Sequence, residues 1–198
     1  MAVNAYTELE AVNLILRNMG EARVNSLINP PLDAADALGT LQEVSLEVQK
    51  RGWYFNTELH RFIPDNTGTI GLPPNTLGVS AVGPDRGLQV VNRGDKLYRI
   101  KPYDNGSTFT GPVHVALVLG LEFDELPASA RSYIAIRAAR VAQVRVVGDQ
   151  LSGQEDQQDE TRALAELQSE QLSTEKLSLK NSLTVANALS GANIVLVS

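Results

Sequence analysis

The chain has 198 residues, 43% of them hydrophobic, which predicts a soluble globular protein able to bury a core, as one domain or two small ones. It has no cysteine and two histidines, His60 and His114, so disulfides, thiolate metal sites and cysteine nucleophiles are excluded, and neither a metal nor a cofactor is expected. The first residues lack the pattern of a secretory signal, and no stretch reaches the roughly 18 apolar residues of a membrane span, so we expect synthesis in a cytoplasm and no membrane partner.

The net charge of −6 is distributed unevenly along the chain. Residues 1–50 carry −4 and residues 149–198 carry −5, whereas residues 51–110 carry +2 and residues 111–148 carry +1. A free-standing nucleic-acid-binding protein normally has a strong basic surface, because neutralising phosphates supplies most of its affinity. The charge pattern is therefore not typical of that class.

Two helices are predicted before residue 53. Thr7-Glu8-Leu9-Glu10 matches a capping box, and apolar residues then recur every three or four positions up to Gly20, which can end a helix in the left-handed conformation. A second helix is predicted after Asn29-Pro30-Pro31, with Asp33 as its cap and Gly52 as its terminator. Its apolar stripe comprises Leu38, Leu41, Val44 and Val48.

The pattern changes between residues 58 and 123, where glycine and proline separate short β-prone runs. Asn92-Arg93-Gly94-Asp95 predicts a turn between strands at Leu88–Val91 and Lys96–Ile100. His114–Phe123 predicts a long buried strand with a bulge at Gly120. Ile70–Gly78 is too rich in proline for a central strand and is interpreted as a loop or an edge.

Two more helices are predicted after this insert. Pro127 can open a third helix that continues to Gly148, and Ser152-Gly153-Gln154-Glu155 is a second capping box ahead of an acidic fourth helix. Five side chains of the third helix are expected to face the core: Ala130, Ile134, Ala138, Val141 and Val144.

These elements predict an α+β fold. Residues 1–57 and 124–180 form a four-helix bundle, residues 58–123 form an inserted antiparallel β subdomain, and residues 181–198 form a C-terminal arm. The arm contains the apolar run Ile194, Val195, Leu196 and Val197, which we expect to be buried in an interface.

The chain lacks the short motifs of serine hydrolases, P-loop nucleotide hydrolases, zinc proteases and dinucleotide-binding enzymes. Asp124 and Glu125 are the best pair of carboxylates for acid–base catalysis, which a glycan or peptidoglycan hydrolase requires. Adjacent residues on an extended segment point in opposite directions, so an acidic flank before the helix at Pro127 is the favoured interpretation. No catalytic residue is assigned.

Two further sets of residues admit a binding or a packing interpretation. Trp53, Tyr54 and Phe55 are consecutive aromatics that either stack on bases or pack at the joint between bundle and sheet; packing is favoured, with Trp53 and Phe55 on one side. We assign the joint to Gly52, Trp53, Phe55 and Asn56. Four arginines of the third helix also have two interpretations: they contact phosphates, or they pair with acidic helices or form an interface. The second interpretation is favoured. The four residues are Arg131, Arg137, Arg140 and Arg145.

Five blocks of the sequence follow one another in a characteristic order: residues 8–27, residues 33–58, residues 63–65, residues 90–98 and residues 123–140. In this order they resemble the tail tubular protein A family, the head-to-tail adaptors of T7-like bacteriophages. Within the second block, the joint residues Gly52, Trp53, Phe55 and Asn56 match the family's pattern.

The resemblance implies a structural virion protein and no enzyme. Its copies are expected to form a dodecameric ring at the head–tail junction, between the portal protein and a tail nozzle protein similar to tail tubular protein B. Double-stranded DNA is expected to pass through the ring without specific binding. The candidate interface residues are then Arg131, Arg137 and Arg140 on the third helix and Ile194, Val195, Leu196 and Val197 in the arm. The protein would be made in the cytoplasm of the host bacterium.

Overall fold

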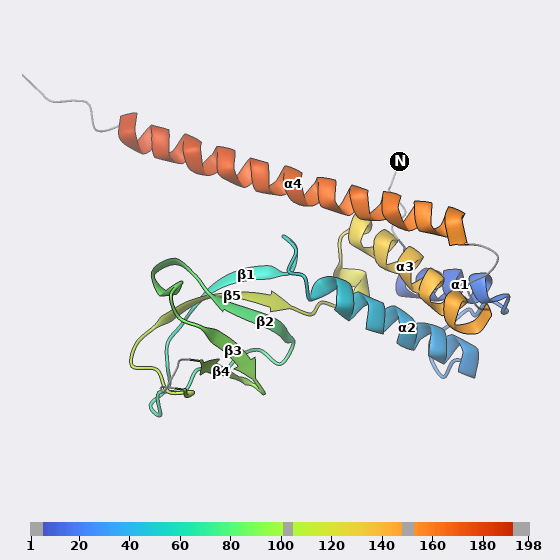
Figure 1. The fold of residues 1–198 in the computed structure, drawn as a ribbon, viewed down its shortest axis with the longest axis horizontal. Helices are drawn as coiled ribbons and strands as arrows, with labels where there is room; N and C mark the ends of the chain where they lie inside the picture. Colours follow the sequence, from blue (N-terminus) through green and yellow to red (C-terminus); the bar gives the residue numbers. More distant parts are fainter. Residues whose placement is uncertain (1–5, 101–104, 148–152, 192–198) are drawn as a thin grey trace, which may run out of the picture.

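The structure, a computed structural model, describes residues 6–100, 105–147 and 153–191, and of residues 147, 153–156 and 177–191 it describes the backbone only. It has a helical part and a β part, and the β strands come between the second and third helices (Figure 1). This arrangement confirms the predicted α+β fold. The helices are α1 (Glu8–Met19), α2 (Leu32–Gln49), α3 (Ala128–Val147) and α4 (Gly153–Gly191).

The predicted signals at the two ends of α1 are confirmed. The Glu10 amide donates to the Thr7 hydroxyl at 3.3 Å, and the Thr7 amide donates to the Glu10 carboxylate at 2.8 Å. At the other end, Gly20 has a φ of 82°, a left-handed conformation that glycine adopts without strain.

The predicted cap of α2 is wrong. Pro31 occupies the cap position, no side chain of the described residues caps the helix, and Asp33 lies in the first turn. The φ angle of proline is fixed at a value that suits the start of a helix. The helix therefore begins at Leu32, one residue before Asp33. Asp33 still stabilises α2, because a carboxylate in the first turn interacts favourably with the helix dipole.

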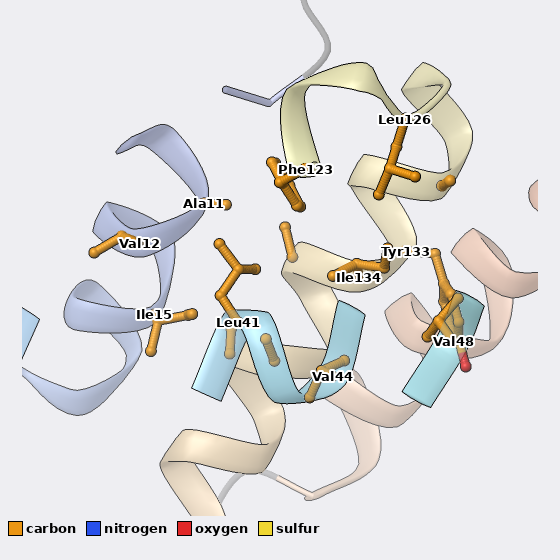
Figure 2. Packing of buried hydrophobic residues seen from close by; sticks show 14 of the residues in the cluster. Ala11, Val12, Ile15, Leu41, Val44, Val48, Phe123, Leu126, Tyr133 and Ile134 are labelled. Atoms are coloured by element: carbon orange, nitrogen blue, oxygen red, sulfur yellow. The ribbon is translucent and has the colours of Figure 1, made fainter. Parts of the chain in front are cut away.

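The helical core lies between α1, α2 and α3, and Figure 2 shows Ile15, Leu41 and Ile134 from these helices pointing into one space. The buried face of α3 is rich in alanine, which lets its neighbours approach closely. These alanines are at most 3% exposed: Ala130, Ala135, Ala138, Ala139 and Ala142.

One of the α3 side chains that were predicted to face the core is exposed, so that prediction is wrong. Val144 is 45% exposed, because it lies about 200° around the helix from the buried Ala142. Ala130, Ile134 and Ala138 are buried as predicted.

Helix α4 packs against α3 through the buried Ala163 and Leu167. Its 39 residues continue across the boundary predicted at residue 180, and Figure 1 shows its C-terminal part extending past the other helices. Leucine and alanine in residues 181–191 favour a helix and offset the serines and asparagines there. Ser152 and the run Ile194–Val197 lie outside the described residues.

The β subdomain is a three-stranded antiparallel sheet facing a two-stranded hairpin. The sheet has the order β1-β5-β2, and its inner face contributes Val113, Val115, Leu117 and Leu119 to a second core. The strands are β1 (Thr57–Phe62), β2 (Thr76–Ala81), β3 (Val90–Arg93), β4 (Lys96–Arg99) and β5 (Val113–Leu119), and two short 3₁₀ helices are η1 (Gly83–Asp85) and η2 (Phe123–Glu125).

The predicted hairpin is confirmed by the pairing of β3 with β4 around Gly94, whose φ is 64°. The prediction for Ile70–Gly78 also holds, since it is a loop leading into the edge strand β2. The bulge at Gly120 is wrong: β5 ends at Leu119, and the Gly120 amide donates to the Asn75 carbonyl at 2.8 Å. The register shift lies instead between Thr76 and Gly78 in β2.

The alanine face of α3 gives a first testable prediction. Ala138→Leu should lower the free energy of unfolding by about 1–3 kcal/mol, because a larger side chain cannot enter a filled core without displacing its neighbours. Chemical denaturation of both proteins measures this difference. Val144→Leu is the matched control, since that site is exposed, and an equal loss in both variants would contradict the packing described.

Candidate functional site

The site that the sequence singles out is the joint between the helical bundle and the β subdomain. Helix α2 ends at Gln49, and Gly52 then turns the chain toward β1 with a φ of 73°. A Cβ added at Gly52 would lie 3.0 Å from Cγ2 of Val118 in β5, so the position combines a left-handed backbone with a close approach to the sheet. Both features favour glycine.

Trp53 packs in the joint and belongs to the helical core. Its side chain is 7% exposed, and its indole Nε1 donates to the Val48 carbonyl at 2.8 Å. The Phe55 ring is stacked parallel to it, with ring centroids 6.4 Å apart. A buried tryptophan cannot stack on nucleic-acid bases, so the structure gives no support to the base-binding interpretation.

The segment around Trp53 is a turn, whereas the prediction that Trp53 and Phe55 share one side applied the alternation of an extended segment. The Asn56 amide donates to the Trp53 carbonyl at 3.2 Å, which closes the turn. Trp53 and Phe55 nevertheless share one side, as expected, while Tyr54 contacts α4.

Two buried amide side chains, Gln49 and Asn56, join the bundle to the sheet, and we call them the amide clamp. Each is 1% exposed. The Asn56 Nδ2 donates to the carbonyls of Gln49 at 3.0 Å and Leu119 at 2.8 Å, and its Oδ1 accepts from the Trp53 amide at 2.8 Å.

The Gln49 side chain of the amide clamp binds the segment that follows β5. Its Oε1 accepts from the Leu121 amide at 2.7 Å, and its Nε2 donates to the Leu121 carbonyl at 3.0 Å. The end of α2 is thus hydrogen-bonded to the chain leaving the sheet. Sequence reasoning assigned Asn56 to the joint but missed Gln49, because the partner of the Gln49 side chain is 72 positions away.

Helix α4 is anchored at the same joint through Tyr54. The Tyr54 amide donates to Oε1 of Gln171 at 2.8 Å, and its hydroxyl donates to the Glu170 carboxylate at 2.6 Å. Ser129 of α3 also donates to Glu170. Burial and the adjacent Glu170 carboxylate raise the pKa of the Tyr54 hydroxyl well above its ordinary value, so it remains a hydrogen-bond donor.

The arginines of α3 pair with acidic side chains of neighbouring helices. Arg137 contacts Glu160 of α4 and Glu47 of α2, each at 2.8 Å, and Arg140 also pairs with Glu160. Glu160 is only 8% exposed, so these contacts fix α4 to α3.

Two other arginines of α3 make more exposed pairs. Arg145 binds Glu43 of α2 at 3.0 Å and holds the pKa of that carboxyl below its ordinary value. Arg131 lies 3.8 Å from Asp124. The arginines therefore pair within the chain, and a role for Arg131, Arg137 and Arg140 at a subunit interface stays a prediction.

The candidate catalytic carboxylates serve to cap helical segments. Asp124 Oδ1 accepts from the Glu8 amide at the start of α1, at 3.0 Å, and the Glu125 carboxylate accepts from the Glu122 amide at 3.2 Å. Both residues are exposed in η2. Burial, Asp124 and Glu122 raise the pKa of the nearby Glu8 carboxyl. Asp124 thus caps the start of α1, and not α3 as the sequence suggested.

Among the described residues, no cluster of histidine and carboxylate side chains has the arrangement of a metal site, and none of the helices combines the length and the apolar content of a membrane span. A groove of about 440 Å³ lies beside the joint, lined in part by Leu46, Gln49 and Leu121. A second groove, of about 490 Å³, lies between the N-terminal part of α2 and the end of α3.

The helical bundle is held to the β subdomain by the amide clamp, and large apolar side chains are exposed at both ends of the molecule. Exposed apolar side chains of this kind are typical of a protein that assembles with others. The comparison with known families agrees with this class. A sequence model described as "Tail tubular protein" matches residues 9–177, and the chain therefore belongs to the tail tubular protein family. It is accordingly a structural component of a bacteriophage tail, in a family not known for enzymatic activity.

A relative from a bacteriophage supports the same assignment. The chain is 31% identical over 128 residues to tail tubular protein A of Klebsiella phage KP34, in an alignment that covers 65% of this chain and 67% of the relative. The resemblance seen in the sequence blocks is thus confirmed.

Trp53 gives the first prediction for this site. Trp53→Ala should lower the free energy of unfolding by about 3–5 kcal/mol, because it removes a large buried ring and leaves a cavity in the joint. Chemical denaturation monitored by circular dichroism measures the loss. Leu59→Ala, at a side chain 77% exposed, is the control and should cost far less. A loss below about 1 kcal/mol for Trp53→Ala would show that the indole ring contributes little to the stability of the joint.

Glu160 gives a second prediction. Glu160→Gln should lower the free energy of unfolding by about 1.5–3 kcal/mol, because two arginines lose a charged hydrogen-bond acceptor in a largely buried position. The matched control is Glu166→Gln, whose exposed pair with Arg162 at 3.6 Å should contribute less than about 1 kcal/mol. Urea titration of the two variants tests this, and similar losses in both would refute a special role for Glu160.

Proposed function

We propose that this chain is a head-to-tail adaptor, whose copies form a dodecameric ring between the portal protein and the tail nozzle. The observation that carries the proposal is the family match over residues 9–177, because it covers the bundle, the β subdomain and most of α4. In this proposal the protein is made in the host bacterial cytoplasm and is incorporated at the head–tail junction of the virion.

A closed ring requires heterologous contacts, in which one face of a subunit binds a different face of the next. The charge distribution suits such contacts, since the helical part, residues 1–57 and 124–180, carries a net charge of −6, whereas the β subdomain, residues 58–123, is neutral overall. We assign the bundle to contacts between subunits and the β subdomain to the nozzle. Residues 181–198, with Ile194–Val197, are assigned to the portal or to a neighbouring subunit.

The ring would also form part of the passage for double-stranded DNA. A neutral or acidic lumen allows DNA to slide, whereas a wall of lysine and arginine would hold its phosphates. The arginine pairing on α3 supports this proposal, because Arg137 and Arg140 are paired with Glu160 and Glu47 within the chain. Few basic side chains should therefore face the lumen of the ring.

Electron microscopy of the purified chain mixed with the portal protein of the same phage tests the proposal. We expect closed rings docked on the portal, with the portal alone as the control. A chain that remains monomeric in the presence of the portal would contradict the adaptor function. In a map of the docked ring, a lumen lined by arginines would contradict the passage of DNA without binding.

A further inference from the structure

The outer face of β1 and of the residue that follows it carries an exposed apolar and basic strip, formed by Leu59, Arg61 and Ile63, which we call the β1 strip. Leu59 is 77% exposed and Ile63 is 68% exposed. Arg61 is exposed as well and has no ion-pair partner among the described residues. Because alternate residues of an extended chain point to the same side, these positions share one face.

The β1 strip lies at the edge of the sheet and continues onto it. Among the described strands β1 pairs with β5 alone, and Leu59 lies directly opposite Ala116. The inner face of the sheet packs on the second core, so the strip faces away from that core. An edge strand with large exposed apolar side chains is a site for association.

The second groove lies at the opposite end of the molecule, and we call it the α2–α3 groove. Its apolar floor and acidic rim are complementary to the apolar and basic β1 strip. Its volume is about 490 Å³, and its walls include the small residues Ala35, Gly39 and Ala142 and the apolar Val146, which is 64% exposed. Small residues allow the backbone or side chains of a partner to approach closely.

The rim of the α2–α3 groove is acidic. Glu21, Asp33 and Asp36 line it, and their carboxylates have no cationic partner among the described residues. Glu43 also lines it but is paired with Arg145. The groove therefore presents three unpaired negative charges around an apolar floor, which suits an apolar strip with a central cation.

A single chain cannot bring these two surfaces together. The α2–α3 groove lies at the N-terminal end of α2, whereas β1 begins beyond its C-terminal end, as Figure 1 shows. Asp36 in the groove lies 13 residues before the end of α2 at Gln49, which is about 20 Å along the helix axis. The amide clamp also holds the bundle and the sheet in one arrangement, which prevents the chain from folding one surface onto the other.

We propose that the β1 strip of one subunit docks in the α2–α3 groove of a second copy of the same chain. Leu59 and Ile63 contact the apolar floor, and Arg61 pairs with Asp36 and Asp33. The contact is heterologous and repeats from copy to copy. This inference rests on the proposed ring function and names the surfaces through which the ring forms.

A charge-exchange experiment with the full-length chain tests the contact. Arg61→Glu places a carboxylate against the acidic rim, and Asp36→Lys places a cation against Arg61. Each variant alone should form at least roughly tenfold fewer rings than the unchanged chain, as counted by electron microscopy with the portal protein present, because like charges would then face each other in every contact.

An equimolar mixture of the two variants should form rings again. In such a ring the variants alternate, and the carboxylate introduced at position 61 of one variant meets the ammonium introduced at position 36 of the other. In the next contact Arg61 of the second variant meets Asp36 of the first, as in the unchanged chain. Recovery in the mixture therefore requires that these two positions face each other.

The controls make the same charge changes at exposed positions of the β subdomain outside both surfaces. Arg86→Glu and Asp95→Lys should form rings like the unchanged chain. Circular dichroism melting should show all four variants folded. Normal rings from either single variant, or a mixture that remains unassembled, would overturn the proposed contact while leaving the ring itself intact. An unchanged chain that forms no ring would overturn both the contact and the adaptor function.

Discussion

The hydrogen bonds of Gln49 and Asn56 hold the end of α2, the turn at Trp53 and the chain leaving β5 in one arrangement. Both amides are 1% exposed, so every lost partner would leave a buried polar group without a hydrogen bond. Small rotations between bundle and sheet would break several of these bonds together. Leu121 packs against both cores, and the amide clamp adds hydrogen bonds that hold the two subdomains in one arrangement.

Helix α4 depends on this joint as well as on the bundle. Glu160 fixes its first part to α3, while Glu170 and Gln171 fix its middle to Tyr54, directly beside the amide clamp. Two attachments along one helix define its direction and not merely its position. The direction of the remaining helix, up to Gly191, is therefore set by the joint. A change in the angle between bundle and sheet would move that end of the molecule most.

The sequence predicts those features whose physical causes lie within a few residues. The capping box of Thr7 and Glu10, the end of α1 at Gly20 and the hairpin at Gly94 each depend on local backbone geometry. The pairing of the α3 arginines with acidic helices also follows from charge. The amide clamp and the cap that Asp124 gives to α1 were not predictable, because their partners are 63 to 116 positions away. Val144 was mispredicted because the buried face of α3 continues from Ala138 to Ala142, four residues on, and Val144 lies about 200° around the helix from Ala142.

The distribution of unpaired charge follows from the same packing. The arginines of α3 are used within the chain, and Arg137 and Arg140 neutralise the carboxylate that α4 brings against them. Asp33 and Asp36 in the first turns of α2 have no ion-pair partner among the described residues. The same holds for Arg61 on β1. Because the amide clamp holds these groups at opposite ends of one body, each molecule has a fixed polarity. A body with unlike charges at its two ends pairs more favourably head to tail than end to like end, and such pairing produces a ring where the rotation from copy to copy closes, as the proposed contact requires.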